Sequence, residues 1–211
     1  MARQLKQKLA VCAFTVASAG PATAGIVWND ATTDFSNNRA APTFVPFSLG
    51  QNDVIGQTGS ADGTGATTDR DYFTFIVPNF SKLVSLTLVN LGLTAGGASF
   101  IGLQAGPTVT VNPAAPDPSL LLGYEHLDPS DVGLDILPEM GAKADAAGFT
   151  PPLGAGQYAV WLQDSNIAPS KYTLRFDIAA VPEPATALLG LAGFLMVWRV
   201  RRINRSSRSP F

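Results

Sequence analysis

The chain has 211 residues with one cysteine, one histidine and a formal net charge of −2, from 14 lysine and arginine residues against 16 acidic ones. Eight of the cations and one of the acids lie in the two ends of the chain. The body between residues 25 and 181 therefore carries six cations and fifteen acids, a net charge of −9. Such an acidic body disfavours nucleic acid, because phosphate binding depends on cationic contacts.

Residues 1–24 have the three parts of a secretory signal peptide. A basic start is followed by an apolar stretch over residues 9–19 and then by small residues at Ala22 and Ala24. Small side chains at these two positions fit the cleavage pocket of signal peptidase, so we expect export and cleavage after Ala24. The basic start consists of Arg3, Lys6 and Lys8.

Two alternatives to a cleaved signal peptide remain. One is a buried N-terminal helix. The other is a lipoprotein attached through Cys12, but Val11 is bulky for the position before a lipidated cysteine. Cleavage after Ala24 removes Cys12, so the mature chain is expected to hold no disulfide and no cysteine metal site.

The body of the chain, residues 25–180, has the pattern of many short strands in one domain. Alternate residues from Tyr172 to Ile178 are apolar, which is typical of a half-buried strand. Glycine and proline separate such runs at short intervals, as turns between strands require. We therefore predict an all-β fold with a single antiparallel β-sandwich or jelly-roll domain. The other predicted strands cover residues 44–49, 54–58, 72–77, 83–91, 99–105, 109–111, 120–124 and 157–163.

Two stretches of the body have weaker patterns. Residues 28–42 are polar, and we expect an irregular lead-in or an edge strand there. A helical turn or two is expected near residues 139–147, the best helical candidate in an otherwise strand-rich body.

The C-terminal end combines a Pro-Glu-Pro motif, an uncharged apolar stretch and a basic tail. Residues 185–198 would form a helix of about 21 Å, against a hydrocarbon core of about 30 Å. A hydrophobic helix that extends to about residue 203 can span the membrane, with arginines near its edge reaching the interface. The basic tail over residues 199–208 places this end on the cytoplasmic side. The motif consists of Pro182, Glu183 and Pro184.

These three parts, in this order at the end of the chain, resemble the PEP-CTERM sorting signal of Gram-negative bacteria over residues 181–208. The resemblance implies that Pro182, Glu183 and Pro184 are recognised by an exosortase-type processing enzyme during a transient association with the membrane. It also implies a final place at the cell surface, in the extracellular matrix or outside the cell, with extracellular polysaccharide and biofilm as expected associations. A plain C-terminal anchor is the alternative.

Part of the body resembles pre-peptidase C-terminal (PPC) domains, over roughly residues 68–179. An aromatic strand preceded by acids at residues 69–78 is followed by a Gly-x-Tyr strand at residues 156–161 and a final alternating strand at residues 172–178. The resemblance implies a small β-sandwich that accompanies secreted proteins and in some cases binds matrix polymers or calcium. It brings no catalytic residues.

Two groups of aspartates are candidates for a weak structural calcium site, the one cofactor considered. In the first group, Asp62, Asp69 and Asp71 surround a glycine- and threonine-rich loop that leads into a strand. Asp69 and Asp71 are two residues apart, so both side chains can face one side of that strand. Calcium takes carboxylate oxygens from such loops, and solvated loop acids are the alternative. The second group consists of Asp128, Asp131 and Asp135.

Trp161 is the candidate for stacking against a sugar ring. In a regular strand it lies on the face opposite Tyr158, and a core tryptophan is the alternative to an exposed platform.

Catalytic patterns are sparse in this sequence. His126 is the only histidine, and the Gly-x-Ser-x-Gly motif of a serine hydrolase does not occur. Glu125 and Glu139 are the only glutamates of the body that could form a glycosidase pair. We therefore expect an exported non-enzymatic protein of the surface or matrix, with a carbohydrate- or calcium-binding module as the rival hypothesis and a secreted hydrolase as the third.

Overall fold

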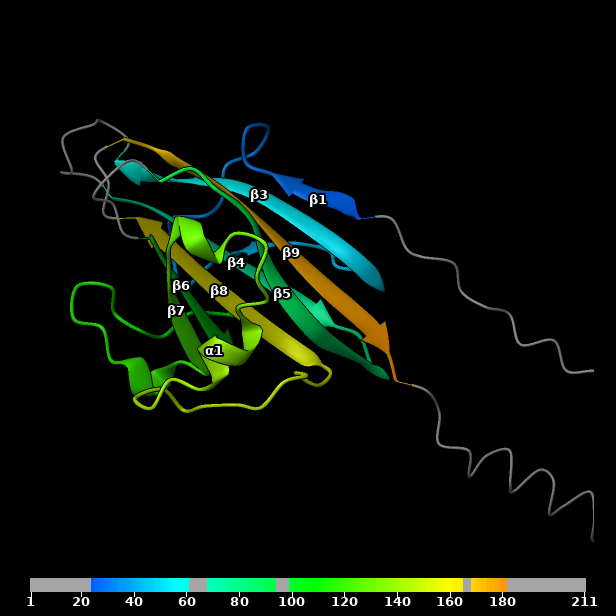
Figure 1. Ribbon diagram of the computed structural model, residues 1–211. Coiled ribbons are helices and arrows are strands. Elements are labelled where there is room, and N and C mark those ends of the chain that lie inside the picture. The colour runs from blue at the N-terminus through cyan, green and yellow to red at the C-terminus, as the bar shows by residue number, and fades with distance from the viewer. Residues whose placement is uncertain (1–23, 61–67, 94–98, 165–167, 182–211) are drawn as a thin grey trace, which may run out of the picture.

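The computed structural model describes residues 24–60, 68–93, 99–164 and 168–181, which form strands linked by turns, loops and short helical turns (Figure 1). Most strand pairs are antiparallel, and this confirms the predicted all-β class. The strands are β1 (Gly25–Asn29), β2 (Thr43–Phe44), β3 (Gly50–Ser60), β4 (Thr68–Val77), β5 (Ser81–Leu91), β6 (Ser99–Ala105), β7 (Gly123–Leu127), β8 (Gly156–Asp164) and β9 (Ser170–Ala180). The helical turns are η1 (Pro118–Leu120), η2 (Pro129–Asp131) and α1 (Leu137–Gly141).

Within these residues the strands follow one path in the order β5-β9-β3-β4-β8-β6-β7, while β1 pairs in parallel with β3 and β2 with β4. Strand β3 changes partner along its length. Its residues from Gly50 to Thr58 lie against β9, and Gly59 lies against β4. Gly59 has a φ of +148°, and a Cβ there would lie 2.8 Å from the Cα of Pro169. The change of partner therefore needs a glycine.

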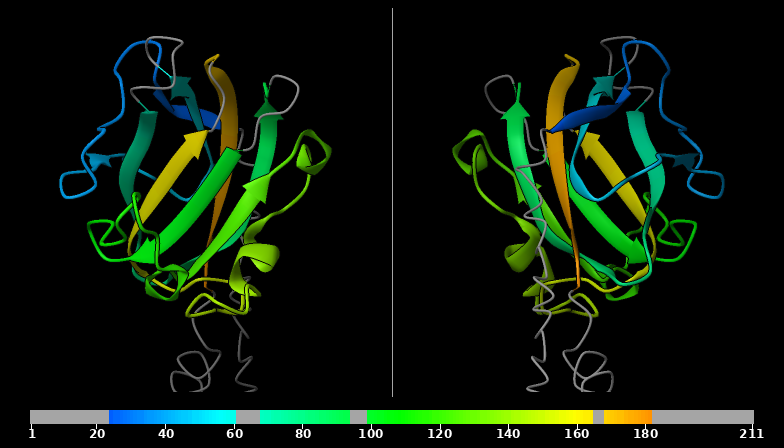
Figure 2. Two further views of the ribbon diagram at one scale, coloured as in Figure 1. Left: turned by 90° about the vertical axis from the view of Figure 1, so that its left-hand side faces the viewer. Right: turned by 90° about the vertical axis from the view of Figure 1, so that its right-hand side faces the viewer.

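The path thus has two groups of strands, β5-β9-β3 and β4-β8-β6-β7, which twist around a shared interior (Figure 2). Side chains from both groups form the main core. A smaller core lies on the other face of β4 and β8, where Tyr72 and Trp161 pack with loop residues such as Val109 and Val111. Strands β4 and β8 are therefore buried on both faces.

The alternation predicted for the last strand is confirmed. In β9 the side chains of Tyr172, Leu174, Phe176 and Ile178 are buried in the main core, and the residues between them are only half-buried. The same pattern separates Tyr158, in the main core, from Trp161, in the smaller one, as their spacing predicted.

Some predicted strands are wrong in extent. Residues 45–49 and 109–111 lie in loops, where Val45, Val109 and Val111 are buried and Phe47 is half-buried, so the apolar side chains there pack without forming a sheet. The loop at 109–111 is held by Arg39, whose guanidinium donates to the carbonyl oxygens of Val109 and Thr110. The strand predicted over 120–124 begins later, as β7, because η1 occupies its first residue.

The helical turn predicted near 139–147 is present as α1, displaced toward the N-terminus. None of the helices in the described residues is long and apolar enough to cross a membrane. Residues 1–23 of the predicted signal peptide, Ala22 among them, lie outside the described residues, which begin at Ala24. The same is true of the sorting motif at Pro182, Glu183 and Pro184 and of the hydrophobic helix predicted over about 185–203.

Candidate functional site

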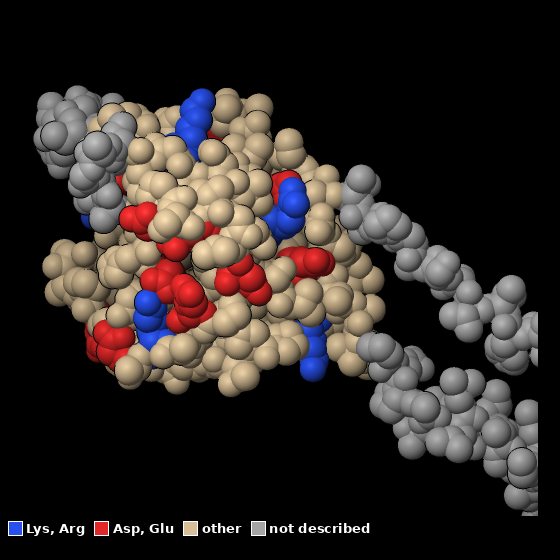
Figure 3. Space-filling view, in the orientation of Figure 1, with Lys and Arg blue, Asp and Glu red and all other residues tan. Residues whose placement is uncertain are grey.

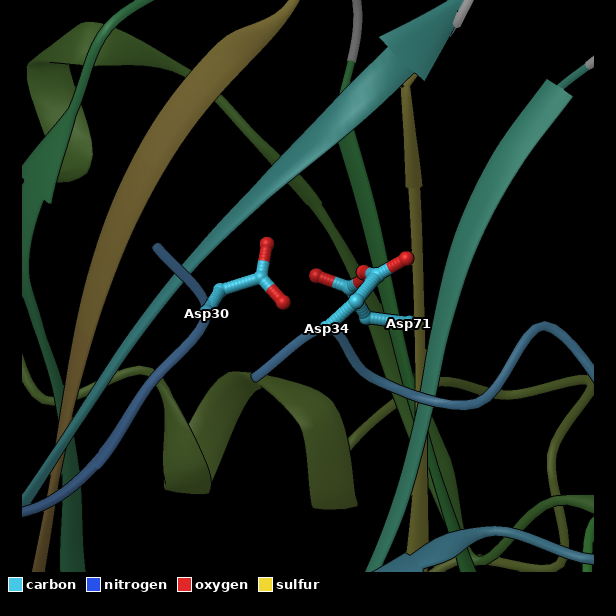
Figure 4. Close-up of side chains that lie close together, drawn as sticks. All are labelled: Asp30, Asp34 and Asp71. Carbon is cyan, nitrogen blue, oxygen red and sulfur yellow. The ribbon is translucent and has the colours of Figure 1, made fainter. Parts of the chain in front are cut away.

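Three aspartates converge at one end of the main core. Asp30 and Asp34 lie in the loop that follows β1, and Asp71 lies on β4. Each offers a carboxylate oxygen, and these three oxygens lie within 4.8 Å of one another. Figure 4 shows the two loop side chains approaching that of Asp71. Residues 30 and 71 are far apart in sequence, so the fold creates this group.

Aromatic stacking holds the loop in place. Trp28 stacks on Phe35, with ring centroids 5.4 Å apart, and Phe35 stacks on Phe73 of β4 at 5.1 Å. Asp30 adds two hydrogen bonds: its amide donates to the carbonyl oxygen of Ile55, and its carboxylate accepts from the amide of Phe35 at 2.9 Å. The loop is therefore fixed against both β3 and β4, with its acids at the start of the core.

Asp71 is the most buried member, with an exposed fraction of 0 %. Its Oδ2 accepts a hydrogen bond of 2.6 Å from the hydroxyl of Tyr172. Its Oδ1 is buried and has no hydrogen-bond partner among the described residues. A buried carboxylate oxygen without a partner is costly, since neither water nor a donor replaces its lost hydration. The burial of this oxygen therefore requires a proton on the carboxyl or a cation beside it.

Gly56 on β3 makes the contact between Tyr172 and Asp71 possible. A Cβ at position 56 would collide with the hydroxyl end of the Tyr172 side chain. The missing side chain thus leaves the space through which the Tyr172 ring extends toward Asp71.

The electrostatics of the group favour a positive charge. Burial, helped by the nearby negative charges of Asp30 and Asp69 and opposed by the hydrogen bond from Tyr172, raises the pKa of the Asp71 carboxyl from 3.8 to about 8. Burial also raises the pKa of Asp30 to about 6 and that of Asp69 above its ordinary value. Perturbed pKa values gathered in one place are a marker of functional sites. A cation between these carboxylates would offset their mutual repulsion.

A pocket of about 530 Å³ with a mixed polar and apolar lining opens beside the group, a volume within the usual range for ligand sites. Asp30, Asp34 and Asp69 line it, while Asp71 lies behind them. The pocket is also lined by Asn29, Gln57 and Lys171, among others.

The donor set determines which ion the group could hold. It consists of carboxylate oxygens alone, the ligands of hard cations such as Ca²⁺ and Mg²⁺. Calcium forms bonds of 2.3–2.6 Å, so oxygens within 4.8 Å of one another fit around one ion. Calcium also tolerates irregular geometry, which suits ligands from a loop and a strand.

The structure describes two of the three residues in the first predicted calcium group. Asp69 and Asp71 both belong to this region, as their spacing indicated. Asp69 is half-buried and accepts a hydrogen bond of 3.1 Å from the side-chain Nδ2 of Asn37. Asp62 lies outside the described residues. Sequence analysis missed Asp30 and Asp34, which it assigned to a polar lead-in. The two aspartates four residues apart beside Trp28 and Phe35 were the available signal.

The second predicted group, Asp128, Asp131 and Asp135, binds backbone amides. Asp128 and Asp131 cap η2 reciprocally, and Asp135 accepts from the amides of Leu86 and Leu137 at 2.9 and 3.1 Å. These acids satisfy backbone N–H groups of turns and of β5, which agrees with the alternative of loop acids better than with a second calcium site. Acidic side chains gather on the face that carries α1 and β5, where lysine and arginine are scattered (Figure 3).

Trp161 is 2 % exposed, so the prediction of an exposed sugar platform is wrong and the core alternative holds. Its ring packs between those of Tyr72 and Phe100, with centroids at 6.2 and 4.8 Å. The alternation of residues in the sequence alone left both the exposed and the core position open for Trp161. Because β8 is buried on both faces, position 161 lies in a core.

The glutamates considered for hydrolysis have different surroundings. Glu125 on β7 is buried and forms an ion pair of 2.7 Å with Lys143. Glu139 is exposed in the first turn of α1, and His126 is exposed beside the rings of Phe100 and Tyr124. The Glu125 carboxylate is thus already engaged by a cation.

Comparison with protein-family models, with curated proteins and with solved structures finds no match to this chain. The resemblances to PEP-CTERM signals and to PPC domains therefore rest on the sequence motifs alone.

Proposed function

We propose that this chain is an exported, non-enzymatic protein whose body is a calcium-binding β-sandwich at the cell surface or in the extracellular matrix. Two observations carry the calcium proposal: one carboxylate oxygen from each of Asp30, Asp34 and Asp71 lies within 4.8 Å of the others, and the buried Oδ1 of Asp71 has no hydrogen-bond partner among the described residues. The core shared by the two groups of strands supports the sandwich.

Export agrees with the chemistry of this site. Three or four carboxylates drawn from a loop and a strand form a site of modest rigidity, and extracellular modules bind calcium at roughly 10⁻⁴–10⁻³ M. The signal-peptide pattern at residues 1–24 places the chain where calcium at such concentrations is present.

Thermal unfolding of the full-length chain with and without calcium tests the binding. At a calcium concentration of 100 Kd the native state gains about 2.7 kcal/mol, which raises the midpoint by about 5–10 °C. Asp71→Asn keeps the shape and the acceptor for Tyr172 but removes the charge, and we expect it to abolish the shift. Asp177→Asn removes an equivalent charge on β9, outside the group, and retains the shift. An unchanged midpoint in the parent protein refutes the calcium site.

The intact mass of the protein recovered from its native host tests export and sorting. We propose that the mature chain begins at Gly25 and ends near Pro182–Pro184, outside the cytoplasmic membrane, after processing by signal peptidase and an exosortase-type enzyme. A chain that still ends at Phe211 in a cell that processes such signals contradicts the sorting proposal and leaves a plain C-terminal anchor.

A further inference from the structure

The aspartate group leaves part of a calcium ion's coordination shell open. Asp30, Asp34 and Asp71 contribute one converging oxygen each, while calcium takes six to eight oxygen ligands. Second carboxylate oxygens and nearby backbone carbonyls can fill some positions, and water or a ligand fills the remainder.

The open coordination positions of the ion face the pocket. Asp71 is fully buried and approaches the group from the core side, whereas Asp30 and Asp34 line the pocket wall. An ion held by all three therefore presents its remaining positions to a space of about 530 Å³. That space is large enough to admit more than the metal-bound waters.

The rest of the lining can bind hydroxyl groups. Asn29 and Gln57 offer amide donors and acceptors, and Lys171 on β9 offers an ammonium. Among the residues that the structure describes, no carboxylate forms an ion pair with Lys171. Its ammonium is therefore available to donate to a ligand in the pocket.

Charge selects the class of ligand. Four aspartates, one Ca²⁺ and Lys171 together leave a net negative site within an acidic body. The negative charge of the site would repel an anionic ligand. An apolar ligand would displace water from the polar groups of the lining without replacing its hydrogen bonds. A neutral hydroxyl-rich molecule avoids both costs, because its oxygens can ligate calcium while its hydroxyl protons are donated to carboxylates.

We propose that this pocket binds a neutral saccharide whose adjacent hydroxyl groups replace two waters on the calcium ion, with Lys171 and Gln57 as further contacts. This inference rests on the proposed calcium site and names the ligand class of that same site.

Titration calorimetry of the full-length chain with soluble mannan, dextran and galactan tests the proposal, with alginate as the acidic comparison. We expect at least one neutral polymer to bind in saturating calcium and to lose binding in EDTA. Lys171→Ala and Gln57→Ala should each weaken that binding by about fivefold or more, through the loss of a hydrogen bond, while retaining the calcium-induced rise in thermal midpoint. Lys82→Ala, a lysine on β5 outside the pocket, is the matched control and should bind as the parent does.

Each contrary outcome has a distinct meaning. If calcium raises the midpoint but none of the neutral polymers binds, or if binding persists in EDTA, the saccharide inference is overturned and the calcium site stands. Binding of alginate without any neutral polymer overturns the charge argument. If calcium leaves the midpoint unchanged, the proposed function itself fails.

Discussion

Two acidic regions of this molecule look alike in sequence but have different partners in the fold. Asp128, Asp131 and Asp135 accept hydrogen bonds from backbone amides, those of their own turns and that of Leu86 on β5. Asp30, Asp34 and Asp71 instead face one another, and one buried oxygen of Asp71 has no donor among the described residues.

The difference lies in where the compensating positive charge comes from. In the turn region the peptide N–H groups supply it, so the chain satisfies its own carboxylates. In the Asp30–Asp34–Asp71 group the backbone supplies it only in part, and a proton or a cation must supply the rest. Composition alone cannot distinguish the two, and the predictions below separate them by experiment.

The largest expected effect is a loss of stability with rising pH when calcium is absent. Burial raises the pKa of Asp71 to about 8 and that of Asp30 to about 6, so the native state keeps protons that the unfolded chain releases above about pH 4. The contribution of these two groups to stability is therefore fully present below about pH 4 and is lost as the pH rises to 8, a loss of about 5 kcal/mol for Asp71. Urea unfolding in EDTA across this range measures the loss.

Asp71→Asn provides the control for this pH dependence, because an amide cannot titrate. The variant should keep nearly the same stability from pH 5 to pH 8, apart from the smaller contribution of Asp30. A parent protein in EDTA that is most stable at pH 8 would contradict the buried, raised pKa of Asp71.

The next effect concerns Gly56, which leaves room for Tyr172 to reach Asp71. Gly56→Ala forces its Cβ against the fully buried tyrosine hydroxyl, and we expect about 3 kcal/mol of destabilisation from overpacking. Gly154→Ala is the matched control, since a Cβ there meets nothing within 4 Å. Equal unfolding midpoints for the two variants would mean that the Tyr172 ring can move aside at little cost.

Sequence periodicity predicted the parts of this fold that depend on local alternation. The buried faces of β9 and the opposite orientation of Tyr158 and Trp161 follow from a repeat of two residues, which any half-buried strand must show. Loops that pack apolar side chains into a core can be as rich in apolar residues as strands, although they belong to no sheet. That is why Val45 and Val111 lie in loops within predicted strands.

The candidate site was only half predictable, for a topological reason. Asp69 and Asp71 share one strand, so their spacing was informative. Asp30 and Asp34 reach Asp71 only because β1 pairs in parallel with β3 and because Phe35 stacks on Phe73. The β1–β3 pairs join residues about 27 apart and the Phe35–Phe73 stack joins residues 38 apart, and no local pattern encodes such contacts.

A third prediction compares one aspartate from each acidic region. Asp34→Asn removes a charged ligand from the group, and we expect it to weaken calcium binding by roughly 10–100-fold. Loss of a residue that only supports a metal ligand already weakens metal binding by about this much, so loss of a ligand should cost at least as much. Asp131→Asn, in the turn region, should leave the calcium affinity unchanged. Calorimetric titration of calcium measures both, and comparable losses in the two variants would show that general acidity, and not convergence, holds the ion.

The smallest effect tests whether the turn region depends on acceptor oxygens alone. Asp135→Ala removes the acceptor for the amides of Leu86 and Leu137, and we expect about 1 kcal/mol of destabilisation, equal with and without calcium. Asp135→Asn keeps an acceptor oxygen but not the charge, so it should retain most of the parent's stability. Chemical unfolding of both variants separates the two contributions. If Asp135→Asn is as unstable as Asp135→Ala, charge matters in the turn region as well. The contrast with the Asp30–Asp34–Asp71 group would then rest on calcium dependence alone.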